Sequence, residues 1–346
     1  MGILSSSTDF VGIDIGSSGI RMVQLKHMGS GNPVLVAYAK AALPVGVASS
    51  DSQIDQDKIA ETIKALLKEA NITATQAVTG INTSDAFVTT LSTPQLNPGE
   101  LAKAMRLQAD QYIPMAVDQV KMDWNVIGQG KTPDQMKVLL VAAPNTVVNK
   151  YLAIIEKAGL KLAALEINSV AQTRSLMPKT DLTTVILDLG QISSEITIVD
   201  KQAPQLVRSV NIGGTTLVRA VAQALGLDDV QAEQFTKKFG LTQSKLEGQV
   251  AKAMKPSLDS LVTEINNSIK YFMTENPTAK IEKMIVTGET ISLPEMTNFL
   301  ANATGLPVEL GNPWGNISYP AAQQQILMGE ATVYAVAAGL ALRESI

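Results

Sequence analysis

Short runs of alternating apolar residues open the chain and predict β-strands. Apolar positions at helical spacing then predict a helix over 54–70, after a polar connection. The predicted strands of this first half lie at 10–15, 20–27, 33–40, 76–81 and 86–91. Three strands, one helix and the strand at 76–81, in this order, predict one half of an α/β protein, with the strand at 86–91 after it.

A different unit follows, over residues 92–165. Asn97 precedes Pro98 and Glu100, which suit the first turn of a helix, and the helical spacing continues to Tyr112. Strands are predicted at 120–127, 136–142 and 161–167, with a helix at 146–158. This stretch is therefore predicted to be a small α+β insertion inside the first half.

The pattern of the first half returns in the second. Strands are predicted at 184–187, 195–200, 205–212, 283–287 and 308–310. Helices are predicted at 217–225, 254–274, 293–305 and 331–342, with a helical excursion over 228–253. The repeat predicts two related halves.

Each half begins with the same short design, in which an apolar strand ends on an aspartate, one apolar residue, a glycine and small hydroxyl residues. The first copy contains Asp14, Gly16, Ser17 and Ser18, and the second contains Asp188, Gly190, Ser193 and Ser194. Glycine lets the backbone approach a phosphate, hydroxyl and N–H groups donate to it, and a strand-end aspartate can hold Mg²⁺ through water. One such hairpin is ordinary turn chemistry, but the doubling favours a nucleotide held between two halves.

Composition excludes several classes of protein and several kinds of site. The chain has 346 residues, no cysteine and one histidine, His27, which excludes a Cys/His metal site or nucleophile. The net charge is −4 and no basic run carries aromatic residues, so nucleic acid is not expected as a partner. No apolar stretch reaches the roughly 20 residues of a membrane span, and the first ten residues lack a signal peptide. We therefore expect a cytoplasmic protein, with His27 at its surface.

The chain resembles the actin-like ATPase superfamily and, within it, the PilM family of type IV pilus assembly proteins. The resemblance runs from about Phe10 to Arg343. Its most specific segments are 107–114, 141–144, 158–160, 212–217 and 337–342. It implies an α/β, two-lobed, ribonuclease-H-like duplicated fold with an inserted subdomain of the FtsA/PilM type. The implied subdomains are 1A (9–91, 166–181 and 320–346), 1C (92–165), 2A (182–227 and 263–319) and 2B (228–262).

The resemblance also implies roles for single residues, with ATP or ADP and Mg²⁺ as cofactors. Asp14 and Asp188 would hold Mg²⁺ through water, and Glu233, Lys237, Gly288 and Glu289 would lie near the adenosine. The implied phosphate-binding residues are Asp14, Gly16, Ser17, Ser18, Arg21, Gly190, Ser193, Ser194, Gly213 and Gly214. Glu233 can also be interpreted as a solvated helix residue.

Three departures from the family pattern concern the nucleotide. Asn168 stands where a glutamate would position the attacking water; because an amide cannot accept a proton, slow hydrolysis is expected. Asn168 can equally be interpreted as a helix start. Glu289 replaces a glycine of the adenosine turn and brings a side chain towards the base, and Thr236 stands where lysine is common, with Lys237 next to it.

The function implied by the resemblance is that of a binding and assembly module at the inner face of the cytoplasmic membrane. The implied partners are the cytoplasmic tail of a PilN-like inner-membrane protein, the pilus motor ATPases and the platform protein, and homo-oligomers are left open. Nucleotide would act as a conformational ligand. The tail would lie in a groove at Tyr112, Ile113 and Pro114, although the helix-end position of Tyr112 favours a core side chain.

Two other functions are compatible with this type of fold. A sugar or acid kinase on the same fold needs an aspartate base, and Asp85, Asp110 and Asp123 lie in no recognisable kinase context. An FtsA-like filament-forming cell-division protein would carry a C-terminal amphipathic membrane helix, whereas this sequence ends on Arg343-Glu-Ser-Ile. The PilM interpretation is therefore preferred.

Overall fold

The computed structural model describes residues 10–27, 31–178 and 182–343. The chain divides into two compact units, one built from residues up to Met177 together with those from Asn312 onward, the other from Pro178–Gly311. Some predictions lie outside the described residues. These are the predictions for residues 1–9 and 344–346 and the predicted subdomain boundary at 179–181. Each unit is described by itself.

The first unit is built on a five-stranded mixed sheet in the order β3-β2-β1-β4-β8. β1 and β2 form an antiparallel hairpin, whereas β4 is parallel to β1 and to β8. The strands are β1 (Phe10–Gly16), β2 (Gly19–Lys26), β3 (Val34–Ala42), β4 (Gln76–Ile81) and β8 (Lys161–Ile167). The strands predicted within 10–40 and at 76–81 are confirmed.

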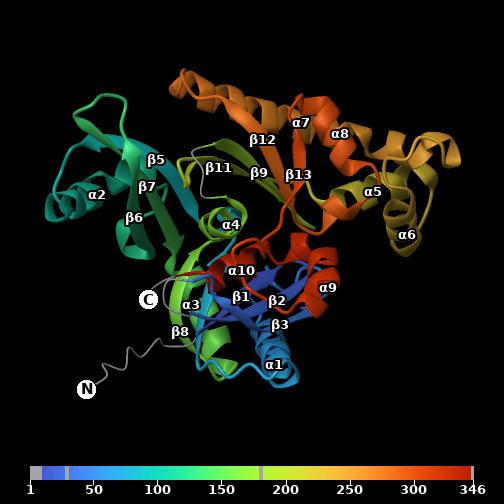
Figure 1. Ribbon diagram of the computed structural model, residues 1–346, viewed down its shortest axis with the longest axis horizontal. Helices are drawn as coiled ribbons and strands as arrows, with labels where there is room; N and C mark the ends of the chain where they lie inside the picture. The colour runs from blue at the N-terminus through green and yellow to red at the C-terminus, as the bar shows by residue number, and fades with distance from the viewer. Residues whose placement is uncertain (1–9, 28–30, 179–181, 344–346) are drawn as a thin grey trace. The chain divides into compact units, whose positions relative to one another are not determined.

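Helices cover both faces of this sheet (Figure 1). Side chains alternate along β1, so that Val11, Ile13 and Ile15 join a core with α1 (Gln53–Glu69) and α3 (Asn145–Lys157). On the opposite face, α10 (Ala335–Ala341) packs on β1 and also against α4 (Asn168–Leu176). A sheet buried on both faces gives a firm base to the turns at its strand ends.

The second unit repeats this arrangement, since its sheet has the order β11-β10-β9-β12-β13. β9 and β10 form the antiparallel hairpin, and β12 is parallel to β9 and β13. The strands are β9 (Thr183–Leu189), β10 (Ser194–Asp200), β11 (Ala203–Val210), β12 (Ile281–Thr287) and β13 (Val308–Leu310). Counted along each half, the two strand orders are identical, which confirms the predicted duplication.

Four helices share one hydrophobic core with this second sheet. They are α5 (Gly214–Leu225), α6 (Asp229–Phe239), α7 (Gln249–Glu275) and α8 (Met296–Thr304). α7 begins five residues before its predicted start and contains Pro256, although proline removes one helical hydrogen bond. Burial of Val250, Ala251 and Met254 in the core explains why the helix includes this earlier segment.

The insertion both begins and ends earlier than predicted, because the strand predicted at 86–91 in the first half pairs with β7 of the insertion. Its three-stranded sheet has the order β5-β7-β6 and shares a core with α2. Its elements are β5 (Phe87–Pro94), α2 (Pro98–Tyr112), β6 (Val120–Gln129) and β7 (Gln135–Pro144). The prediction that α3 and β8 belong to the insertion is wrong, because β8 pairs with β4 and α3 packs in the core of the main sheet.

The segment after Gly311 belongs to the first unit. Trp314 is 1% exposed and packs with Tyr334 and Tyr38, as expected of a core aromatic, and the Leu35 N–H donates to the Ser318 carbonyl oxygen. A short helix that was not predicted, α9 (Gln324–Gly329), precedes α10. Within the described ranges, no helix is long and apolar enough to cross a membrane.

Candidate functional site

The first hairpin joins β1 to β2 through Ser17 and Ser18. Asp14 faces Arg21 across the pair, and Gly16 faces Gly19 at its end. Cross-strand partners lie on the same face of a sheet, so the hairpin carries a carboxylate beside a guanidinium. Both side chains are buried, at 8% and 9% exposure.

The Arg21 guanidinium lies beneath the turn. Its Nη1 donates to the Gly19 carbonyl oxygen (3.1 Å), and its Nη2 donates to Ser18 Oγ (3.0 Å). A Cβ on Gly16 would lie 2.8 Å from Nη1, so a glycine at this position leaves the space that the guanidinium occupies. A fixed positive charge with five N–H donors suits an anion at this turn.

The second hairpin joins β9 to β10 and is tied to two other segments. The Gly190 N–H donates to the Ser193 carbonyl oxygen (3.1 Å) and closes the turn. The N–H of Gly214, at the start of α5, donates to the Gly190 carbonyl oxygen (3.0 Å), which also accepts a bond from Thr290 Oγ1 (2.9 Å). The hairpin, the start of α5 and the turn after β12 therefore form one rigid platform.

Two glycines allow this close packing. A Cβ on Gly213 would lie 2.7 Å from the Gly190 carbonyl oxygen. Gly288 has φ +90°, and a Cβ there would overlap the Asp188 carboxylate and lie 2.6 Å from the Leu189 carbonyl oxygen. The structure thus brings Gly213, Gly214 and Gly288, which were assigned to the site only through the family resemblance, together with Asp188 and Gly190 of the predicted hairpin.

The serines of the two hairpins differ in whether their hydroxyl groups are already hydrogen-bonded. Ser194 is fully buried and donates its hydroxyl to the Ile212 carbonyl oxygen, and Ser18 accepts from Arg21. Among the described residues, the hydroxyls of Ser17 and Ser193 have no hydrogen-bond partner. Ser17 and Ser193 are therefore the hydroxyl groups available to a ligand, whereas Ser194 has a structural role.

Asp188 is a candidate for a metal-bound carboxylate. It is partly exposed at the end of β9 and faces Glu195 across the hairpin. No group of three or more acidic or histidine side chains in the described ranges could hold a metal ion. A site with the Asp188 carboxylate alone suits Mg²⁺, which usually keeps several waters and takes one or two carboxylates together with phosphate oxygens.

Asn168 begins α4, so the helix-start interpretation is confirmed. Its Nδ2 donates to Asn82 Oδ1 (2.9 Å), whereas its Oδ1 is buried without a hydrogen-bond partner. This oxygen lies against Gly80 of β4, where a Cβ would overlap it. Asn168 therefore places an unsatisfied acceptor at the carboxyl end of β4.

The residues predicted near the adenosine are arranged differently. Glu233 and Lys237 form an ion pair with each other along α6, 2.6 Å apart; Lys237 is exposed and Glu233 partly exposed. Thr236 is buried, and its Oγ1 donates to the Ala232 carbonyl oxygen, so it is a core residue. Glu289 is exposed beside Gly288. The interpretation of Glu233 as a solvated helix residue accounts for its ion pair with Lys237.

The predicted partner groove lies at the end of α2. Tyr112 is 42% exposed and Pro114 is exposed, whereas Ile113 is buried in the core of the insertion. The expectation that Tyr112 is a core side chain is therefore wrong. Ile113 takes that place because the helix ends at Tyr112 and turns the next side chain inward.

A buried tyrosine lies near the first hairpin and was not among the predicted site residues. Tyr151 of α3 is 6% exposed. Burial raises the pKa of its hydroxyl above the ordinary value, and the charges of Asp85 and Asp14 raise it further. No motif marks this residue, because the α3 pattern is that of any amphipathic helix.

This burial predicts a loss of stability at alkaline pH. The unfolded tyrosine ionises near pH 10 while the folded one stays protonated, so the free energy of unfolding falls by up to about 1.4 kcal/mol per pH unit above that value. Tyr151→Phe should make the fall shallower in urea unfolding measured across this range. Tyr271→Phe, at an exposed tyrosine, is the control, and equal slopes for both variants would contradict the assignment.

Solved structures similar to this chain share its fold. A chain of a PilM-PilN type IV pilus biogenesis complex matches with a TM-score of 0.83 and 25% identity, covering 96% of this chain and 97% of that one. The ethanolamine utilization protein EutJ from Carboxydothermus hydrogenoformans matches with 0.56 and 16% identity, covering 96% and 88%. MreB 5 of Spiroplasma citri, bound to AMPPNP, matches with 0.55 and 9% identity, covering 98% and 96%. The last two show the fold alone, and the predicted actin-like α/β fold is confirmed.

The family comparison covers nearly the whole sequence. A sequence model of the family described as "Type IV pilus assembly protein PilM" matches residues 12–345. The match spans both hairpins, the insertion and the second unit. This chain therefore belongs to the PilM family of type IV pilus assembly proteins.

Proposed function

We propose that this chain binds the cytoplasmic tail of a PilN-like inner-membrane protein and so joins the assembly platform of a type IV pilus. The observation that carries this proposal is its similarity, over 96% of its length, to a chain of a PilM-PilN complex. Binding to such a tail would hold the protein at the inner face of the cytoplasmic membrane. The pilus motor ATPases and the platform protein are proposed as further partners.

The insertion offers the features that capture of an extended tail requires. β7 is the central strand of its sheet, so β5 and β6 each pair with one strand and leave one backbone edge for β-addition. Exposed apolar side chains lie on α2, where Leu107 is 81% and Tyr112 42% exposed. We place the tail along this surface, with Tyr112 and Pro114 as contact residues and Ile113 as their support from the core.

Replacing the exposed tyrosine tests this placement. Tyr112→Ala should weaken binding of a dye-labelled tail peptide about tenfold, because a central aromatic contact typically contributes more than 1 kcal/mol. Fluorescence anisotropy measures the affinity. Tyr271→Ala, which removes a more exposed tyrosine from α7, should leave the affinity unchanged. Equal affinities of the two variants would refute the placement.

We propose that a nucleotide, ATP or ADP with Mg²⁺, is a conformational ligand of this assembly module. The first hairpin would contact phosphate oxygens through backbone N–H groups, Ser17 and the Arg21 guanidinium. In the second unit, Ser193 and the backbone of Gly213 would do so, with Asp14 and Asp188 facing Mg²⁺ through water. Gly190 and Gly214, whose N–H groups are bonded within the platform, would allow the phosphate to approach closely. The rigid platform around Gly190 supports this assignment, because its groups need no rearrangement on binding. Glu233, Lys237, Gly288 and Glu289 remain the proposed adenosine side.

Hydrolysis of ATP should be slow and should not depend on the side-chain amide of Asn168. An asparagine cannot act as the general base, so Asn168→Ala should change the rate of phosphate release by less than about twofold. A coupled phosphate assay on both proteins measures this rate. A loss of tenfold or more in the variant would show that Asn168 orients the attacking water despite lacking a basic group.

A further inference from the structure

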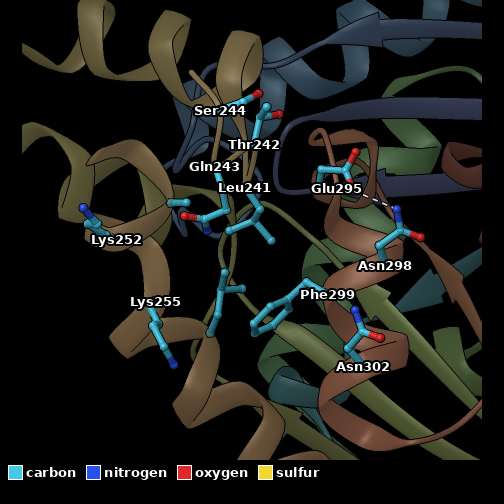
Figure 2. Close-up of a pocket in the computed structure, with 12 residues that line it drawn as sticks. Leu241, Thr242, Gln243, Ser244, Lys252, Lys255, Glu295, Asn298, Phe299 and Asn302 are labelled. Carbon is cyan, nitrogen blue, oxygen red and sulfur yellow. Dashed lines mark hydrogen bonds between the residues drawn. The ribbon is translucent and has the colours of Figure 1, made fainter. Parts of the chain in front are cut away.

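A groove of 710 Å³ lies in the second unit, between α7, α8 and the loop that follows α6 (Figure 2). Lys255 pairs with Asp259, so the two charges left in the lining, those of Lys252 and Glu295, are opposite. The groove therefore favours neither an anionic nor a cationic ligand. Side-chain hydrogen bonds in the first unit are more informative, because they connect the proposed nucleotide site to the insertion.

The side-chain oxygen of Asn168 lies on the same face of the first sheet as the Asp14 carboxylate. Asn168 is 8% exposed, and its Oδ1 is buried without a hydrogen-bond partner. A Cβ on Gly80 would overlap this oxygen, so Oδ1 lies on the face to which that Cβ would point. Ile13 pairs with Thr79 in parallel register, so the next residues, Asp14 and Gly80, share that face on strands about 4.8 Å apart. The unpartnered oxygen is thus one strand away from a proposed Mg²⁺ carboxylate.

The nitrogen of the same amide begins a chain of hydrogen bonds. Asn168 Nδ2 donates to Asn82 Oδ1 (2.9 Å). The side chain of Asn82 in turn hydrogen-bonds the Asp85 carboxylate, and the Asp85 N–H donates to the Asn82 carbonyl oxygen (2.9 Å). Because an asparagine amide has both an acceptor and a donor, Asn82 accepts from Asn168 and donates to Asp85 at the same time.

This chain of hydrogen bonds ends where the main sheet leads into the insertion. The short helical turn η1 (Thr83–Asp85) follows β4 and lies directly before Ala86 and β5. β5 pairs along its length with β7, the central strand of the insertion. The conformation of η1 therefore sets the direction in which the chain enters the insertion.

The Asn168 amide has two discrete orientations. A half-turn would exchange Nδ2 and Oδ1, break the bond to Asn82 and bring two acceptor oxygens together. In the orientation described, the cost is the unpartnered Oδ1, since a buried acceptor without a hydrogen bond costs about 1–3 kcal/mol. A donor at Oδ1 would remove this cost and select the orientation in which the chain of hydrogen bonds is complete.

We propose that Asn168, Asn82 and Asp85 couple nucleotide binding to tail binding. Asn168 Oδ1 would accept a hydrogen bond from a water held by Asp14 and Mg²⁺, which fixes the three side chains and orders the start of the insertion. The tail would then bind an insertion that loses less conformational freedom. This inference rests on the proposed function, and it makes Asn82 a positioning residue that contacts neither ligand.

The test measures the affinity of the full chain for the dye-labelled tail peptide by fluorescence anisotropy, without nucleotide and at saturating Mg-ATP. In wild type, Mg-ATP should tighten tail binding at least about fivefold, the lower end of typical coupling between two sites. Asn82→Ala should bind the tail equally in both conditions, although Mg-ATP still raises its melting temperature. Asn82→Asp, which can accept from Asn168 but cannot donate to Asp85, should also lose the response.

Asn145→Ala is the matched control. Asn145 begins α3, where the chain returns from the insertion to the main sheet, and its Nδ2 donates to the Asp118 carbonyl oxygen (2.8 Å). This variant should keep the wild-type response to Mg-ATP. The inference is overturned if Asn82→Ala keeps the response, if both variants lose it, or if wild type binds both ligands without any response. If wild type binds no tail, or gains no stability from Mg-ATP, the proposed function itself fails and the inference fails with it.

Discussion

Gly339→Ala is expected to destabilise the first unit by about 3 kcal/mol. Gly339 lies in α10 where this helix crosses α4, and a Cβ there would overlap the Ala171 carbonyl group. The obstacle is backbone and not the end of a flexible side chain, so the two helices would have to separate. Arg174 also donates to the Gly339 carbonyl oxygen and restricts that movement.

Urea unfolding of wild type and variant measures this effect, and Gly329→Ala is its control. Gly329 lies ten residues earlier, in α9, where a Cβ would meet no atom within 4 Å. Alanine has the higher helix propensity, so this variant should be equal to wild type or more stable by up to about 1 kcal/mol. Equal midpoints for the two variants would show that α4 and α10 do not pack as closely as described.

Asp188→Ala is expected to abolish the stabilisation of the protein by Mg-ATP. A ligand at about 100 times its dissociation constant adds roughly 2.7 kcal/mol to the free energy of unfolding, which raises the melting temperature by a few degrees. Asp188 is the proposed Mg²⁺ partner in the second unit, and its removal should weaken nucleotide binding by about 100-fold or more. Differential scanning fluorimetry with increasing Mg-ATP measures the shift.

A carboxylate at the other end of the same sheet provides the control. Asp200 ends β10, far along the strand from the hairpin, and accepts a bond from Thr183 Oγ1. Asp200→Ala should lower the melting temperature slightly, through the lost hydrogen bond, but keep the full shift with Mg-ATP. A saturable shift in Asp188→Ala equal to that of wild type would remove Asp188 from the site.

The hairpins and the duplicated order of strands could be predicted because local patterns carry them. Alternation of apolar residues on both sides of Gly16 and Gly190 predicts two strands and a turn without any distant contact. The placement of α3 and β8 could not be predicted in this way. Their sequence continues directly from the insertion, and only the pairing of β8 with β4, which is 85 residues away at Gln76 and Lys161, assigns them to the main sheet.

The sequence could predict which residue types form the site, but not which atoms those residues contact. The pattern identified Asp14 and Gly16, and the family resemblance implied Arg21, but neither predicted that the guanidinium would lie under the turn and bond to Ser18. The pattern grouped Ser193 and Ser194 together, although burial gives Ser194 a structural bond to Ile212. Thr290 and Tyr151 carry no local signal, because each reaches the site through tertiary packing.

Hydrogen–deuterium exchange of the full chain, with and without the cytoplasmic tail of its PilN-like partner, tests the central proposal most directly. Exchange slows where backbone N–H groups become hydrogen-bonded or are covered. The tail should protect amides of α2 and the edge strands of the insertion, within residues 87–144, and leave the strands of the second unit unchanged. Protection confined to other elements, or none at a saturating tail concentration, would contradict the proposed function.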